Sequence, residues 1–149
     1  MIEKFSNKKT VTIYAPVVTV WQALTDPAMI SQYFFGTEMN SDWKEGSIII
    51  VKGEWEGKKF KGNGKVLQAE TQKLLRYSYW SDMSGLPERP ENYHMITYKL
   101  APKNGSTQLS LTEENLTTEA MKDRSDKLWD MVFDNLKKLL ERQIVVQNE

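Results

Sequence analysis

One histidine and one glutamate are the residues of this sequence best suited to proton chemistry as a pair. The segments on either side of Pro102–Gly105 alternate as β-strands do, so this loop predicts an antiparallel hairpin. If the loop has four residues, Ala101 lies opposite Ser106, and counting along both strands places His94 opposite Glu113. Both side chains then lie on the apolar face of the hairpin. A histidine beside a carboxylate can serve as a general acid or base.

Three interpretations of the His94–Glu113 pair stay open at this level. The pair can be a polar contact at the rim of a sheet, a group that orients a bound ligand, or an acid/base pair. A register shift of one residue would turn both side chains away from the apolar face. A shift of two residues in one strand would keep both on that face but separate them.

Aromatic side chains are the second feature with chemical potential. Many occupy positions that the strand and helix periodicities turn inward, where they either fill a core or line an apolar pocket. Tyrosines matter most, because a buried hydroxyl needs a hydrogen-bond partner and could orient a ligand. Together with His94 and Glu113, the predicted ligand-binding residues are Trp21, Tyr33, Phe34, Tyr77, Tyr79, Tyr98, Met121, Trp129 and Phe133.

These residues are distributed over a first strand, two short helices, five further strands and a long helix. Pro16 and the pair Asp26-Pro27 begin the two short helices, since proline suits the first helical turn and aspartate caps it. The last helix, predicted over residues 118–142, has no proline or glycine and carries a continuous apolar stripe. The strands are predicted over residues 10–14, 47–52, 60–70, 73–80, 93–101 and 106–114.

The order of these elements predicts an α+β fold in one domain. Consecutive strands with short connections form an antiparallel meander, and a long amphipathic helix fills the concave side of such a sheet. We therefore expect a curved antiparallel sheet of about six strands around the C-terminal helix. A space between that helix and the sheet would suit a small apolar ligand.

Composition excludes several classes of function. Lys and Arg number 20, as do Asp and Glu, so no net charge favours nucleic acid or an anionic membrane. Without cysteine, and with a single histidine, the usual zinc sites cannot form. No apolar run is long enough for membrane insertion, and residues 1–10 lack the apolar core of a secretory signal. We expect no metal and no cofactor, and a cytoplasmic location, which the absence of cysteine fits.

Several short motifs occur in a characteristic order along the chain. They are Ala15-Pro16, Val20-Trp21 and Leu24-Thr25-Asp26-Pro27 with Tyr33-Phe34, followed by Asp42–Gly46, Gly64–Leu67, Leu75–Tyr79, Thr107–Thr112 and Leu128-Trp129. This series resembles the START-like (SRPBCC) superfamily, and more narrowly its branch of homologues of the activator of the heat-shock-chaperone ATPase (AHSA-type). The resemblance covers roughly residues 8–142. It implies the helix-grip fold and a single START-like domain over residues 1–149.

The resemblance implies three alternative functions. The superfamily includes lipid carriers, polyketide cyclases and aromatases, and co-chaperone domains. We favour a module that binds a small hydrophobic, aromatic or lipid-like molecule. An enzyme like the cyclases would use His94 and Glu113, and an interaction domain would contact a chaperone through its outer surface. A chaperone partner is the less expected outcome, because the chaperone activators carry an additional domain. Exposed sheet edges leave a homodimer open.

Overall fold

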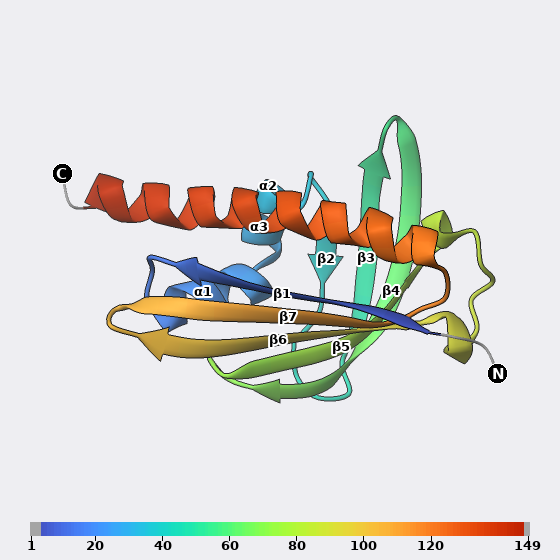
Figure 1. The fold of residues 1–149 in the computed structure, drawn as a ribbon, viewed down its shortest axis with the longest axis horizontal. Coiled ribbons are helices and arrows are strands. Elements are labelled where there is room, and N and C mark those ends of the chain that lie inside the picture. Colours follow the sequence, from blue (N-terminus) through green and yellow to red (C-terminus); the bar gives the residue numbers. More distant parts are fainter. Residues whose placement is uncertain (1–3, 148–149) are drawn as a thin grey trace.

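The structure, a computed structural model, is one antiparallel sheet with a long helix lying across its concave face (Figure 1). It describes residues 4–147, with side chains for residues 4–141, so residues 1–3 and 148–149 of the predicted domain lie outside the described residues. The elements are β1 (Phe5–Ile13), α1 (Val17–Thr25), α2 (Pro27–Tyr33), β2 (Glu38–Asn40), β3 (Ile48–Trp55), β4 (Lys58–Glu70), β5 (Leu74–Ser81), the 3-10 turns η1 (Asp82–Ser84) and η2 (Pro90–Asn92), β6 (His94–Lys103), β7 (Ser106–Leu116) and α3 (Glu119–Gln147).

The predicted α+β helix-grip architecture is confirmed, but the sheet has seven strands rather than about six. Its order is β1-β7-β6-β5-β4-β3-β2, and each neighbouring pair is antiparallel. The additional strand, β2, has three residues and pairs with residues 50–52 of β3. A segment this short shows no alternation that sequence analysis could detect.

Two prolines stand at the starts of α1 and α2, as predicted. Pro16 occupies the N-cap of α1, and Pro27 is the first residue of α2. Asp26 caps α2, since its Oδ1 accepts a hydrogen bond from the backbone N–H of Ala28 at 3.0 Å. At one end of the sheet, α2 contacts α3, whereas α1 contacts α2 and strands β6 and β7 (Figure 1).

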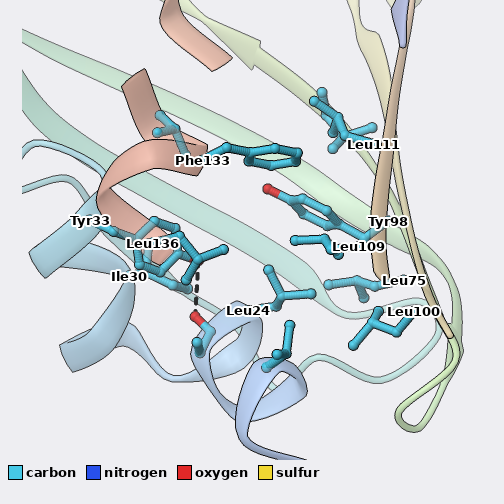
Figure 2. Packing of buried hydrophobic residues seen from close by; sticks show 14 of the residues in the cluster. Leu24, Ile30, Tyr33, Leu75, Tyr98, Leu100, Leu109, Leu111, Phe133 and Leu136 are labelled. Carbon is cyan, nitrogen blue, oxygen red and sulfur yellow. Dashed lines mark hydrogen bonds between the residues drawn. The ribbon is translucent and has the colours of Figure 1, made fainter. Parts of the chain in front are cut away.

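The apolar stripe of α3 faces the concave side of the sheet. Leu136 and Phe133 point from the helix toward the core, where Tyr98 of β6 and Ile30 of α2 meet them (Figure 2). Burying one leucine or phenylalanine side chain stabilises a fold by about 1.5–3 kcal/mol, so this stripe is the main attachment of the helix. The buried stripe residues are Trp129, Val132, Phe133, Leu136 and Leu140; Met121, Leu128 and Leu139 are partly exposed.

Polar contacts fasten α3 to the edge strand β1. Lys9 Nζ lies 2.7 Å from Asp126 Oδ1 and 2.6 Å from Asp130 Oδ1. Asn7 Nδ2 donates to the backbone carbonyl of Lys122 at 2.9 Å. The helix therefore covers the free edge of β1, a position where an uncovered strand could pair with another chain.

The hairpin between β6 and β7 corrects the predicted register. Its loop is the two-residue turn Asn104-Gly105, with φ of +51° and +84°, rather than the four residues from Pro102 to Gly105. Pro102 stays within β6 and pairs with Thr107. Proline is tolerated there because β5 begins opposite Lys99, so the missing N–H of Pro102 deprives no partner strand of a hydrogen bond. The two strands are consequently shifted by two residues from the expected pairing.

Candidate functional site

Glu113 is a buried carboxylate on the concave face of the sheet, with 5% of its surface exposed. Ile96, not His94, lies directly opposite it on β6, so the predicted opposition of His94 and Glu113 is wrong. A shift of two residues preserves the face of each side chain, and diagonal neighbours remain within reach of long side chains. His94 Nδ1 consequently still lies 3.4 Å from Glu113 Oε2.

Two side chains of α3 complete the surroundings of this carboxylate. The indole N–H of Trp129 donates to Glu113 Oε1 at 3.0 Å, and the Ser125 hydroxyl donates to the same oxygen. Burying a carboxylate is costly unless donors replace its water, and here the helix supplies two of them. Glu113 is therefore a polar junction that joins β7 to α3 inside the molecule.

Sequence analysis missed Ser125, although a signal for it exists. Ser125 precedes Trp129 by four residues, and residues four apart share one face of a helix. A serine within an apolar stripe therefore indicates a polar partner on the opposite layer. Identifying that partner as Glu113 requires the correct strand register.

Tyr79 lies directly opposite His94 on β5, at the same end of the sheet. Burial raises the pKa of Tyr79, the charges of Asp82 and Glu113 add to the rise, and the neighbouring Ser81 hydroxyl opposes it. The phenol is therefore neutral at physiological pH. It can take part in hydrogen bonding but cannot act there as a phenolate base.

Tyr77 and Tyr98 form a second pair of buried hydroxyls on adjacent strands. Burial raises the pKa of Tyr77, and the neighbouring Tyr98 hydroxyl opposes part of this rise. Burial likewise raises the pKa of Tyr98, and the charges of Tyr77, Tyr33 and Glu113 add to the rise. These two groups bring polar atoms into an otherwise aromatic region.

A continuous series of aromatic rings connects the helices to the far strands. Most neighbouring rings meet edge to face or tilted, the arrangement that aromatic side chains favour. The series includes five of the predicted ligand-binding residues and one that the sequence did not single out, Trp43. Its centroid distances are 5.6 Å for Phe34–Trp129, 6.0 Å for Trp129–Phe133, 6.1 Å for Tyr98–Trp129, 6.4 Å for Tyr77–Tyr98 and 6.2 Å for Trp43–Tyr77.

The remaining predicted ligand-binding residues lie at the margins of this series. Tyr33 contacts Phe34 at 6.4 Å and donates its hydroxyl proton to the backbone carbonyl of Ala23 at 2.9 Å. Trp21, on α1, is half-buried against the core. Met121 lies in the first turns of α3, where the Thr117 hydroxyl approaches its sulfur at 3.1 Å.

Trp43 has a buried polar atom with no partner in the described part of the chain. Its indole Nε1 is shielded from solvent and makes no hydrogen bond there. Its backbone φ of +57° lies in the left-handed region, which bulky residues rarely adopt. A buried donor without an acceptor costs about 1–3 kcal/mol, so a bound ligand that accepts this hydrogen bond would recover that cost.

A surface groove lies apart from the Glu113 junction. A groove of about 420 Å³ opens at the surface between β1 and α3, lined by Lys9, Thr10, Val11, Asp130, Phe133, Asp134 and Lys137. Within residues 4–147, no three His, Cys, Asp or Glu side chains gather closely enough to hold a metal ion. No helix in the described part of the chain is both long and apolar enough to cross a membrane.

Titration to alkaline pH should show that most of the tyrosines are buried. The pKa values of Tyr33, Tyr77, Tyr79 and Tyr98 are raised by burial, and that of Tyr93 is raised to about 12 by burial and its hydrogen bond to Glu88. Because the folded state prefers the neutral phenols, the stability they contribute is complete below the ordinary tyrosine pKa of about 10 and falls as pH rises through the folded values. We expect tyrosinate absorbance to appear together with loss of near-ultraviolet circular dichroism. Titration of all six tyrosines near pH 10 in a folded protein would contradict this.

The sequence matches a known protein family. Residues 14–141 match the family described as Activator of Hsp90 ATPase homolog 1-like protein. The chain belongs to this family. The predicted AHSA-type resemblance is thereby confirmed.

Several solved structures are similar to this chain. ChR145 from Cytophaga hutchinsonii is 39% identical, with 97% of this chain and 99% of that chain covered and a TM-score of 0.81. NE0264 from Nitrosomonas europaea (20% identity, 94% and 96% covered, TM-score 0.75) and CalU16 from Micromonospora echinospora (22% identity, 97% and 89% covered, TM-score 0.69) share the fold. A comparison with curated proteins gives no match.

Proposed function

We propose that this chain binds a small apolar or aromatic molecule between the sheet and α3. The observation that carries the proposal is the buried Glu113 carboxylate, which accepts a hydrogen bond from Trp129, a member of the connected aromatic series. Small-molecule sites typically combine aromatic walls with a few convergent polar groups. Glu113 and its partners supply such groups here.

Two further features support a site in this region. The His94 side chain beside Glu113 keeps 15% of its surface exposed, so the polar junction is accessible at this end of the sheet. The unpartnered indole N–H of Trp43 lies next to Tyr77, farther along the same aromatic series. Together with the Tyr77 and Tyr98 hydroxyls, these groups place a few polar atoms along a largely aromatic wall.

The test is a fluorescence titration with N-phenyl-1-naphthylamine, a neutral aromatic probe. We expect saturable binding to the unmodified chain and about tenfold weaker binding to Glu113→Gln, because a neutral amide holds the Trp129 indole N–H and the Ser125 hydroxyl less strongly than the carboxylate does. Glu114→Gln is the matched control, since Glu114 neighbours Glu113 on β7 but is exposed on the opposite face. Absence of saturable binding, or equal weakening in both variants, would contradict the proposal.

Acid/base catalysis is a second candidate, favoured by the 3.4 Å approach of His94 Nδ1 to Glu113 Oε2. A proton could pass between a bound substrate and the partly exposed imidazole. If a substrate of this site is found, unchanged turnover in His94→Ala would exclude this role. Activation of a chaperone ATPase is supported by the family description alone.

A further inference from the structure

We propose that the surface groove between β1 and α3 is a second binding site, for a small neutral molecule that carries a primary amide or a lactam. The groove lies at the edge of the sheet, because β1 pairs only with β7. It is separate from the site proposed beside Glu113. Its basis is a stretch of strand backbone at Thr10, between two polar bridges that join β1 to α3.

The two bridges limit the groove at both ends. Lys9 Nζ lies 2.6 Å from Asp130 Oδ1, and Lys137 Nζ donates to the backbone carbonyl of Thr12 at 2.8 Å. Thr10 and Val11 lie between these bridges and line the groove, whose volume is about 420 Å³. Three residue steps of an antiparallel strand rise about 10 Å, and small-molecule sites typically measure about 300–1,000 Å³. The gap in the cover that α3 gives β1 is therefore the size of a small ring system.

The backbone of Thr10 faces this gap. Side chains of α3 already engage two backbone groups on the same edge, since Lys137 binds the Thr12 carbonyl and the Tyr14 N–H donates to Glu141 Oε2 at 3.1 Å. In an antiparallel strand the N–H and C=O of one residue point to the same side, and the side alternates from residue to residue. The N–H and C=O of Thr10 consequently point to the edge that faces α3, together with those of Thr12.

The polar groups of Thr10 determine what the groove can recognise. Its hydroxyl lies 3.3 Å from the Ser110 hydroxyl on β7, so the side chain is engaged with the neighbouring strand. Within residues 4–141, no side chain hydrogen-bonds to the backbone N–H or carbonyl of Thr10. One donor and one acceptor thus stand side by side at the groove. A primary amide or a lactam offers the complementary acceptor and donor in one plane and can make both hydrogen bonds at once.

The charges around the groove favour a neutral molecule. Two lysines and two aspartates line it, so their formal charges cancel. Lys9 pairs with Asp130, and Lys137 lies 2.6 Å from Glu141. Asp134 is paired at 2.8 Å with the lysine four residues farther along α3. A charged ligand would have to compete with these pairs, whereas a neutral amide leaves them intact.

The walls and ends of the groove favour a compact, flat ligand over a peptide. Val11 and Phe133 add apolar surface beside the Thr10 backbone, against which a ring can pack. An extended peptide that paired with β1 would continue along the strand in both directions. It would then meet the Lys9–Asp130 pair on one side and Lys137 on the other.

A matched pair of probes tests the recognition of the amide. 2-Quinolinone is a neutral, flat lactam, and N-methyl-2-quinolinone keeps its ring and carbonyl but lacks the N–H donor. In backbone ¹H–¹⁵N spectra of the full chain, we expect 2-quinolinone to shift the Thr10 amide signal saturably. We also expect it to bind roughly three to ten times more tightly than the methylated probe, the range that one net hydrogen bond provides.

Two proline variants test the position of the site. Thr10→Pro removes the N–H that faces the groove, and an edge strand tolerates proline where this group has no partner strand. We expect it to weaken 2-quinolinone binding about tenfold. Lys8→Pro is the matched control, because Lys8 shares the outward side of β1 with Thr10 but lies outside the groove lining. This control should bind 2-quinolinone as the unmodified chain does.

The outcomes separate this inference from the proposed function. A failure of N-phenyl-1-naphthylamine to bind would remove the proposed function and leave the groove site unaffected. Shifts by 2-quinolinone at the indole N–H of Trp43 without a shift at Thr10 would place the lactam in the aromatic region and overturn the groove site. Equal affinity for the two quinolinones, or no binding of either, would also overturn it. The Thr10 signal of the unmodified chain decides the question even if Thr10→Pro does not fold.

Discussion

Replacement of Trp129 by phenylalanine is expected to lower the free energy of unfolding by about 1–3 kcal/mol. Phenylalanine can keep the edge-to-face contacts with Phe34 and Tyr98 but cannot donate to Glu113 Oε1. The carboxylate would lose one of the two donors that α3 provides, in a position where water does not replace it freely. Urea denaturation followed by far-ultraviolet circular dichroism measures the change.

Trp55→Phe is the matched control for this substitution. Trp55 lies at the end of β3 and contacts Phe35 edge to face at 5.1 Å, outside the Glu113 junction. Trp129→Phe should therefore cost clearly more than Trp55→Phe, and the excess should shrink when Glu113 is already glutamine. Equal costs in the two variants, or no coupling with Glu113→Gln, would show that the indole hydrogen bond does not hold the carboxylate.

The second large effect is expected at the attachment of α3. Leu136 is fully buried and lies among Tyr33, Ile30 and the strands (Figure 2). Leu136→Ala removes its contacts and leaves a cavity between helix and sheet, which costs about 2–5 kcal/mol. The measurement is again the urea midpoint at unchanged slope.

Met131→Ala provides the comparison on the same helix. Met131 is 43% exposed, and its truncation should change the free energy of unfolding by less than about 0.5 kcal/mol. Similar losses for Met131→Ala and Leu136→Ala would mean that α3 does not bury the predicted stripe.

Periodicity and capping were sufficient to predict most of the architecture. The apolar stripe of α3 and the Asp26 cap of α2 depend on local sequence, and the structure contains both. The inward faces of His94 and Glu113 were also predictable, because a strand has a period of two and a shift of two residues leaves each face unchanged.

Register could not be predicted by the same means. Proline usually interrupts a central strand, which favours Pro102 in the loop, yet β6 has no second neighbour at that point. The Asn104-Gly105 pair is a strong signal for a two-residue turn, and giving it precedence over the proline would have placed Ile96 opposite Glu113.

The α3 side of the site depends on contacts between distant segments. Ser125 and Trp129 reach Glu113 from the helix, and only the packing of helix on sheet determines which strand residue they meet. The left-handed backbone that brings Trp43 against Tyr77 likewise has no local signature, since tryptophan disfavours that conformation.

The indole N–H signals of the chain report on whether a ligand binds between the sheet and α3. Trp129 belongs to the junction and Trp43 to the aromatic series, whereas Trp55 lies at a hairpin and Trp80 donates to the carbonyl of Leu86. In ¹H–¹⁵N correlation spectra recorded during titration with N-phenyl-1-naphthylamine, the account predicts saturable shifts for the Trp129 and Trp43 signals and little change for Trp55 and Trp80. A Trp129 signal that stays unchanged while the probe binds, or shifts confined to Trp55 and Trp80, would contradict a ligand site between the sheet and α3.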